Sequence, residues 1–568
     1  MSRKTVGSVR RSSLVSTFGV GSLLPMGDDS VMIRGLADWP KGDVIDEPRL
    51  ASSLQVNEFR SPPTGMRIGD VPAVRFPEWV FCTACRKLGP WWEIVDDEAG
   101  GRRCAACLGT TAPSRFVACC ANGHISDFPY RAWVHGDGRV QAKGHALQLV
   151  ARGHTSSLDD ILIRCSCGKS RSMGGAFKGG ALRAIQPCFG KRPWLDTDDN
   201  GCVETLRTLQ RGSANVWFAM TRSAISIPSI ANAADMFVRR RFADASADAS
   251  SEDLANLFTP PEGLTKEDVR RAIDRMRAPA ATHEAPSERD LRAEEYRALV
   301  QGSASFTDES MFSCQEIDVA DIDLPTTIAQ ISRVGRLREV RALTGFTRLV
   351  PAAEADGPHV APLDDTGGVS WRPAVEVLGE GVFVRLDLEA LGHWAHSPFA
   401  LGRTRRLLAN QAQAGERSMA ARMDVSPKSL LLHSLAHVLI DEMALGSGYP
   451  AASIRERIYD EEDQAGVLVY TATADSAGSL GGLASLSDAN RFTEVLSNGM
   501  ERARWCTADP VCSESSGSGL DGMNLAACHA CLLLPEVSCE RFNLGLDRAT
   551  LVGLADDVSG GFFSNLHT

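Results

Sequence analysis

The stretch FCTACRKLGPWWEIVDDEAGGRRCAAC, from Phe81 to Cys107, contains two Cys-x-x-Cys pairs. Its four thiols are Cys82, Cys85, Cys104 and Cys107. Each pair supplies two thiolates from one tight turn, and the chain between the pairs can run out and back as a hairpin around residues 96–101. A thioredoxin-like redox motif instead has one such pair at the start of a helix. The spacing therefore predicts a structural zinc ion.

The sixteen cysteines of the chain are clustered. Ten lie between Cys82 and Cys202, five lie between Cys506 and Cys539, and Cys314 stands alone. In a reducing compartment, clustering of this kind favours metal ligation over disulfides. Cys314 is expected to be a small buried apolar residue.

A second set of thiols follows in RCSCGKS, PCFGKRPWL and GCVETL. The predicted ligands of this second set are Cys165, Cys167, Cys188 and Cys202. A Cys-x-Cys pair chelates one ion, and two further thiolates complete a tetrahedron. Upstream, ACCANGHISDFPY offers Cys120 and His124 as competing ligands, so the composition of this site stays open. His124 fits a hydrogen-bonded turn as well as it fits ligation.

The C-terminal set centres on CHACLLLPEVSC, from Cys528 to Cys539. Cys528 and Cys531 form the chelating pair, and Cys539 is predicted to close the site. Cys512 is favoured over Cys506 as the fourth ligand because Pro510 sets up a turn before it. A catalytic zinc site needs an open position, whereas an all-thiolate shell indicates a closed structural site. A redox role for the Cys528/Cys531 pair is the remaining alternative.

Two other segments invite catalytic interpretations. His433 and His437 share one face of the apolar segment SPKSLLLHSLAHVLIDEMAL, but Ser434 stands where a zinc protease has Glu. Core or interface histidines are therefore expected. The glycine-rich loop after GVLVYTAT is predicted to be a capped turn, with phosphate contact as the alternative. The polar residues of that loop are Asp475, Ser476 and Ser479.

No catalytic or cofactor-binding residue is predicted. CGKS lacks the first glycine of a phosphate-binding loop, since Ile163 occupies that position. ATP hydrolysis is therefore not expected of this chain.

Composition indicates a soluble globular protein, with 43% hydrophobic and 23% charged residues among 568. The net charge of −11 argues against coating nucleic acid by bulk electrostatics. Local basic runs at 239–241 and between Arg333 and Arg348 leave a nucleic-acid groove open. We expect a cytoplasmic protein without a membrane partner, because we find no apolar run of membrane-spanning length and the N-terminal apolar segment is interrupted.

The predicted fold class is α+β and multidomain, with zinc-ribbon-like modules in the N-terminal half and a mixed α/β C-terminal domain closed by a Cys-rich zinc site. The expected regions are an N-terminal β-rich segment (1–75), a zinc-binding region with two Cys clusters (76–215), a mixed region with a charged helical insertion (216–345), a β-rich connecting region (346–420) and a zinc-binding domain (421–568).

Several stretches carry a family resemblance. LLHSLAHVLI, VYTATADSAGSLGGL and CHACLLLPEVSCERFNLGLDRA resemble the MrfA-like zinc-binding domain. STFGVGSLLP, NGHISDFPY, RPWL, SAISIP and LREVRALTGFTRL resemble the DrmB family, core components of the DISARM anti-phage defence system. The first resemblance implies zinc ligation by Cys528, Cys531 and Cys539. The second implies partnership with DrmA, a helicase-like ATPase, and engagement of phage DNA.

The resulting expectation is a non-catalytic zinc-binding subunit of a restriction complex that helps a helicase bind foreign DNA. Its cofactor is Zn²⁺ in two or three structural sites, and the ATPase activity belongs to the partner. The alternative is a metal-dependent hydrolase or nuclease that uses His433, His437 and the Asp475 loop.

Overall fold

The computed structural model describes residues 5–65, 69–96, 102–136, 144–152, 157–227, 234, 237–238, 250–257, 259–260, 264–277, 285–303, 311–318, 324–355, 357–365, 369–415, 418–471 and 481–565. The chain forms two compact units. Unit 1 comprises 1–46, 56–222 and 341–375, and unit 2 comprises 47–55, 223–340 and 376–568. Each unit thus draws on three separate segments, whereas the predicted regions follow one another along the chain.

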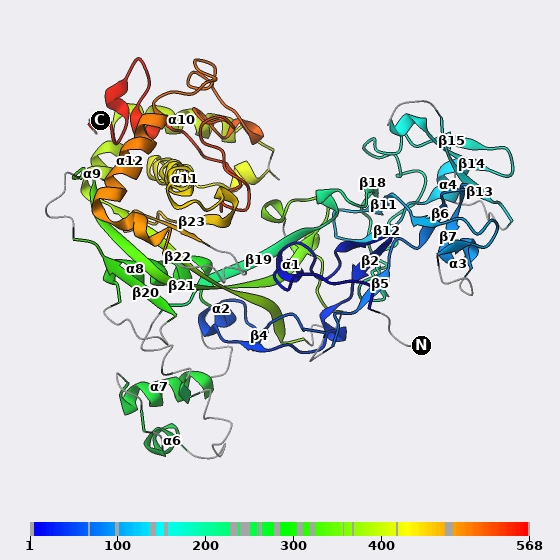
Figure 1. Ribbon diagram of the computed structural model, residues 1–568, viewed down its shortest axis with the longest axis horizontal. Coiled ribbons are helices and arrows are strands. Elements are labelled where there is room, and N and C mark those ends of the chain that lie inside the picture. Colours follow the sequence, from blue (N-terminus) through cyan, green and yellow to red (C-terminus); the bar gives the residue numbers. More distant parts are fainter. Residues whose placement is uncertain are drawn as a thin grey trace. The chain divides into compact units, whose positions relative to one another are not determined.

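Unit 1 consists mainly of short strands (Figure 1). They are β1 (Leu23–Met26), β2 (Asp29–Ile33), β3 (Val44–Ile45), β4 (Glu58–Arg60), β5 (Ala73–Arg75), β6 (Trp79–Cys82), β7 (Lys87–Pro90), β8 (Val95–Asp96), β9 (Arg103–Cys104), β10 (Thr111–Pro113), β11 (Phe116–Cys119), β12 (Ile125–Asp127), β13 (Leu147–Ala151), β14 (Ile161–Cys165), β15 (Ser170–Ser172), β16 (Lys191–Arg192), β17 (Thr197–Asp198) and β18 (Arg207–Gln210). The short helices are α1 (Ser13–Ser16), α3 (Trp91–Ile94) and α4 (Tyr130–His135).

The strands of unit 1 form several small sheets. The largest has the order β10-β6-β7-β13-β14-β15, and two three-stranded sheets have the orders β1-β2-β5 and β12-β11-β18. The hairpin expected between the first two cysteine pairs is confirmed, because β8 pairs antiparallel with β9 and sets Val95 opposite Cys104. Small sheets with little apolar surface depend on additional cross-links for stability, and metal ions are the usual ones.

The core of unit 1 contains a fully buried cation, Arg348, at 0% exposure. Its guanidinium donates to three backbone carbonyls, those of Gly123 at 2.9 Å, Val216 at 2.6 Å and Gly21 at 2.7 Å. It also lies over the rings of two aromatic residues, Trp194 and Phe346, at 5.2 and 4.9 Å. Gly21 has φ +76°, and a Cβ there would lie 2.4 Å from the Phe346 ring. The position that supplies the Gly21 carbonyl to Arg348 therefore requires glycine.

Unit 2 is built around helices. These are α2 (Pro48–Ser53), α6 (Ser251–Leu257), α7 (Lys266–Arg277), α8 (Glu288–Gln301), α9 (Leu388–Ala395), α10 (Pro398–Gln411), α11 (Pro427–Ser447), α12 (Ala489–Ala503) and α13 (Ala549–Val552). Its strands include β20 (Phe312–Glu316), β23 (Ile454–Tyr459) and β24 (Gly466–Thr471). Three long strands contain residues of both units, namely β19 (Phe218–Ile225), β21 (Ile328–Thr347) and β22 (Trp371–Leu386). The sheet order is β19-β21-β22-β24-β23.

Helix α11 occupies the centre of the unit 2 core, where it packs on β23, β24, α12 and α13 (Figure 1). Ser426 caps the helix: its hydroxyl accepts from the N–H of Ser429 at 3.1 Å, and Pro427 is the first helical residue. Contrary to expectation, the described residues include one helix, α11, whose length and composition would allow it to cross a membrane. Its best window is 78% buried inside the structure, which is the pattern of a core helix.

Other sequence expectations have mixed outcomes. The α+β class is confirmed, and the expected charged helical insertion contains α7 and α8. Two glycines in a strand pattern, Gly379 and Gly381, are typical of a hairpin turn, but β22 continues through both. A Cβ at Gly379 or Gly381 would lie 2.0 or 2.3 Å from a carbonyl oxygen of β24, so these glycines allow close backbone approach rather than a turn.

The basic run from Arg333 to Arg348 is not an open groove, since Arg338 and Arg341 are 8% exposed and Arg348 is buried. Residues 239–241 lie outside the described residues.

Candidate metal centres

Five groups of His, Cys and Glu side chains each bring four candidate ligand atoms within 4.8 Å of one another among the described residues. Cluster 1 is Cys82, Cys85, Cys104 and Cys107; cluster 2 is Cys120, His124, Cys188 and Cys202; cluster 3 is His135, His145, Cys165 and Cys167; cluster 4 is Cys506, Cys512, Cys528 and Cys531; cluster 5 is His433, His437, Glu456 and Cys539.

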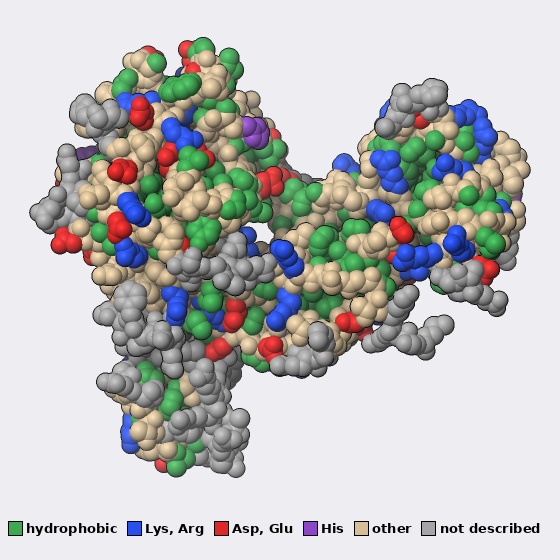
Figure 2. Space-filling model, viewed as in Figure 1, with side chains coloured by type: hydrophobic (Ala, Val, Ile, Leu, Met, Phe, Trp, Pro, Cys, Tyr) green, Lys and Arg blue, Asp and Glu red, His purple; other side chains and the backbone are tan. Residues whose placement is uncertain are grey.

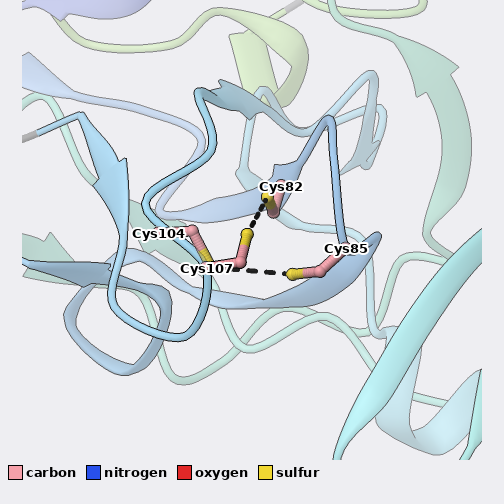
Figure 3. Close-up of side chains that lie close together, drawn as sticks. All are labelled: Cys82, Cys85, Cys104 and Cys107. Atoms are coloured by element: carbon pink, nitrogen blue, oxygen red, sulfur yellow. Dashed lines mark hydrogen bonds between the residues drawn. The ribbon is translucent and has the colours of Figure 1, made fainter.

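Cluster 1 assembles as the sequence predicts, with the four thiols facing one another (Figure 3). The Cys82 and Cys107 sulfurs lie 3.5 Å apart, and those of Cys85 and Cys104 lie 3.7 Å apart. Zinc–sulfur bonds of about 2.3 Å in a tetrahedron separate neighbouring sulfurs by about 3.8 Å. A disulfide would require about 2.05 Å. The spacing therefore fits a tetrahedral thiolate site.

The two turns of cluster 1 have the same backbone form. The N–H of Arg86 donates to the backbone carbonyl of Cys82 at 3.0 Å, and the N–H of Leu108 donates to that of Cys104 at 2.8 Å. Arg86 and Leu108 have φ values of +66° and +58°. Each turn therefore reverses the chain directly after its second cysteine and points both of its thiols inward.

Cluster 2 combines the alternative pair with two of the predicted thiols. Nδ1 of His124 lies 3.3 Å from Cys120 Sγ and 3.6 Å from Cys188 Sγ, and Cys202 Sγ lies 3.9 Å from Cys120 Sγ. Nε2 of His124 points to the Asp199 carboxylate at 3.5 Å. A carboxylate behind the second ring nitrogen is the usual support of a metal-bound histidine.

Cluster 3 adds two histidines to the Cys-x-Cys pair. Nε2 of His135 lies 3.1 Å from Nδ1 of His145 and 3.4 Å from Cys167 Sγ, while Cys165 Sγ lies 3.4 Å from Nδ1 of His145. Nδ1 of His135 contacts the carbonyl of Arg131 at 2.7 Å. A carbonyl only accepts, so Nδ1 carries the proton and Nε2 presents its lone pair to the cluster.

The predicted second set is thus divided, with Cys165 and Cys167 in cluster 3 and Cys188 and Cys202 in cluster 2. The reason is topological. Cys165 ends β14, which pairs with β13, whereas Cys120 follows β11, which pairs with β12 and β18. Cys165 therefore belongs to the six-stranded sheet, whereas Cys188 and Cys202 lie outside the strands and meet Cys120 at the end of β11.

Metal content should distinguish one shared site from two separate ones. We expect C188S/C202S to lose one equivalent of zinc, C165S/C167S to lose another, and the four-fold variant to lose both, measured by plasma emission on the purified full chain. A loss of one equivalent in all three proteins would show that the four thiols bind a single ion.

Clusters 1 to 3 each contain one thiol whose pKa is lowered. The N–H of Gly109 lowers the pKa of Cys107 to about 7, and that of Lys169 lowers the pKa of Cys167 to about 7. The Cys120 thiol lowers the pKa of Cys188 to about 4. Because thiolates are the metal-binding form, these three thiols favour a cation near neutral pH, whereas burial raises the pKa of other members such as Cys85 and Cys165.

Cluster 4 takes Cys506 as its fourth member and not Cys539. Sulfurs of Cys506 and Cys528 lie 3.5 Å apart, and Cys531 Sγ lies 3.8 Å from both Cys512 Sγ and Cys528 Sγ. The Asp509 carboxylate stabilises the turn that begins at Cys506, because it accepts from the N–H of Cys506 at 2.7 Å. All four members are thiols, an arrangement that is typical of a closed structural site.

Cys539 lies instead in cluster 5, 3.2 Å from Nε2 of His433. The expectation of core histidines holds for burial, since His433 and His437 are 0% and 1% exposed, but both rings belong to a group of metal-ligand type. The Asp475 loop, with Ser476 and Ser479, lies outside the described residues.

Three cluster members were missed in the sequence: His135, His145 and Glu456. The two histidines precede a Cys-x-Cys pair, and that combination was a usable signal. Glu456 has no local signal, because it lies in a separate strand, β23, and no other member of its cluster belongs to that strand.

Comparison with known proteins matches two parts of the chain to domain families. Residues 10–218 match a domain of unknown function (DUF8724), and residues 435–532 match the MrfA Zn-binding domain, a range that contains all of cluster 4. This match, together with the clusters, confirms structural zinc as the cofactor. The DISARM protein DrmB of Bacillus paralicheniformis is 30% identical over 564 residues, covering 95% of this chain and 99% of that relative. The chain therefore belongs to the DrmB family of DISARM defence proteins.

Proposed function

We propose that this protein is a non-catalytic, cytoplasmic subunit that partners a helicase-like ATPase and contributes a DNA-binding surface held in shape by zinc. Family membership supports a role in a DISARM assembly. The observation that carries the DNA contact is a local reversal of charge within unit 1. Residues 144–192 have eight Lys and Arg but two Asp and Glu, in a chain with 60 basic and 71 acidic residues.

Six exposed cations in this segment form what we call the basic surface: Arg152, Arg164, Lys169, Lys178, Arg183 and Lys191. Figure 2 shows Lys and Arg side chains gathered on the part of unit 1 that holds β13, β14 and β15. None of the six forms an ion pair with a described residue, so their charge is available to phosphates. Lys169 lies two residues after Cys167 of cluster 3, and Lys191 lies three residues after Cys188 of cluster 2.

Removing cations from the basic surface should weaken DNA binding in a salt-dependent way. We expect R164A/K169A/R183A to lower affinity about 10-fold or more near 0.1 M salt and to reduce the slope of log Kd against log salt by about 2–3. The measurement is fluorescence anisotropy with labelled duplex and single-stranded DNA, with and without the helicase-like partner.

The matched control is R297A/R405A/R406A, which removes three exposed cations from unit 2. It should keep the affinity and slope of the wild type. An equal effect of both triple variants would mean that only net charge matters, and would refute the assignment of this surface.

The hydrolase alternative receives no support from the described residues. His433 and His437 are buried, and Glu456 and Cys539 fill the space in front of their Nε2 atoms. A hydrolytic metal site needs a position open to water and substrate.

A further inference from the structure

Cluster 5 joins three parts of the unit 2 core. His433 and His437 lie one turn apart on α11, Glu456 lies on β23, and Cys539 lies in the segment before α13. All four are buried, at 0%, 1%, 3% and 6% exposure. A polar group in this position destabilises the fold unless every lone pair has a partner.

The two histidines present lone pairs to the centre of the cluster. Nδ1 of His433 contacts the carbonyl of Gly545 at 3.3 Å, and Nδ1 of His437 contacts the carbonyl of Leu532 at 2.8 Å. Since a carbonyl only accepts, both Nδ1 atoms carry a proton, and both rings direct Nε2 toward the centre of the cluster. Metal-bound histidines are oriented in this way by a second-nitrogen hydrogen bond.

The other two members are also electron-rich. Sγ of Cys539 accepts backbone N–H groups from Arg541 at 3.3 Å and Asn543 at 3.2 Å. Oε1 of Glu456 accepts the N–H of Glu540 at 3.0 Å. Donors to a sulfur and a carboxylate stabilise their anionic forms.

These electron-rich atoms face one another. His433 Nε2 lies 3.4 Å from Glu456 Oε1, and His437 Nε2 lies 3.6 Å from Oε2. Nε2 of His437 and Oε2 of Glu456 have no hydrogen-bond partner among the described residues. A single proton shared by His433 Nε2 and Glu456 Oε1 would leave His437 Nε2 and Glu456 Oε2 without a partner. One central cation would instead contact both Nε2 atoms and both carboxylate oxygens.

Distances and charge both fit a divalent ion. With bonds of about 2.0–2.1 Å to nitrogen and oxygen and about 2.3 Å to sulfur, tetrahedral geometry separates ligand atoms by about 3.3–3.6 Å. Three ligand-atom distances in cluster 5, from His433 Nε2 to Cys539 Sγ and from each histidine Nε2 to Glu456, are 3.2, 3.4 and 3.6 Å. One thiolate and one carboxylate neutralise a divalent cation, and neutrality is what a fully buried site requires.

We propose that cluster 5 is a second zinc centre of the C-terminal domain, closed and structural, with His433, His437, Glu456 and Cys539 as its ligands. It does not depend on DNA binding. The match to the MrfA Zn-binding domain covers 435–532, so His433 and Cys539 lie outside the matched range. Mixed nitrogen, oxygen and sulfur ligation selects a borderline ion such as zinc over calcium or magnesium.

The proposed centre is linked to cluster 4 through the chain. Leu532, whose carbonyl orients His437, directly follows Cys531 of cluster 4. Residues 532–538 then lead to Cys539. Both centres therefore position the same short segment.

The test is the metal content of the full chain with Glu456 replaced by glutamine. We expect E456Q to lose one equivalent of zinc, because the neutral amide is a weak ligand, and C539S to lose the same equivalent. The control is E442Q, which alters another buried carboxylate, on α11, that pairs with Arg502 at 2.6 Å. It should keep the zinc content of the wild type.

Crystals of the wild-type chain provide the second measurement, which stands even if the variants fail to fold. An anomalous difference peak above the zinc edge should lie between the two Nε2 atoms, with the peak of cluster 4 as internal reference. A peak at cluster 4 without one at cluster 5, or an E456Q protein with unchanged zinc, would overturn the proposal. DNA affinity is measured separately, so this failure and a failure of the basic surface are distinguishable.

Discussion

Replacing Arg348 with methionine is expected to lower the free energy of unfolding of unit 1 by about 3–5 kcal/mol. The guanidinium is the donor for the carbonyls of Gly21, Gly123 and Val216, all within 2.9 Å. Methionine fills much of the same volume but leaves three buried acceptors without donors. Burial lowers the pKa of Arg348 to about 10, so the side chain remains charged at neutral pH.

Hydrogen exchange of the amides in β11 and β18 should measure this effect within unit 1. R115M is the control, because Arg115 is exposed and its guanidinium bonds the Gln210 side chain and lies 5.8 Å from the Phe116 ring centre. It should change stability by less than about 0.5 kcal/mol. A loss below about 1 kcal/mol in R348M would show that other donors replace the guanidinium.

The second large effect is expected from C528S/C531S, which removes half of the thiols of cluster 4. Structural zinc contributes about 10 kcal/mol or more to the folding of small sites, so the C-terminal part of unit 2 should lose its stable fold. The readouts are the loss of zinc and rapid proteolysis within 427–565.

Cys314 supplies the control for that experiment. It is 1% exposed and belongs to none of the five clusters, so C314A removes a buried thiol without removing a ligand. C314A should keep its zinc and its resistance to protease. A C528S/C531S protein with normal stability would show that cluster 4 does not hold the fold together.

How far the sequence determines the sites depends on the distance between ligands along the chain. Cluster 1 was predictable, because two pairs flanking one hairpin leave few alternative partners. Clusters 2 and 3 were not, since the assignment of Cys165 and Cys188 depends on how the segments that carry them pack. That information resides in tertiary contacts such as β14 on β13.

The same limit applies to isolated polar residues. Helical spacing put His433 and His437 on one face, but the pattern cannot distinguish satisfied core histidines from ligands without Glu456 opposite them. In the sequence, Arg348 stands at the end of a basic run, but its side chain is 0% exposed in the core of unit 1. Its three acceptors come from segments far apart in the sequence, so their convergence has no local signature.

Clusters 2 and 3 are nested: residues 135–167 of cluster 3 fall inside the 120–202 span of cluster 2. Loop-closure entropy grows with the length of the loop, so the inner site can form at lower entropic cost. Once it has closed, the ends of the outer loop are already near each other. The two ions should therefore be acquired in order, with the inner site acting as a template for the outer one during synthesis of the chain.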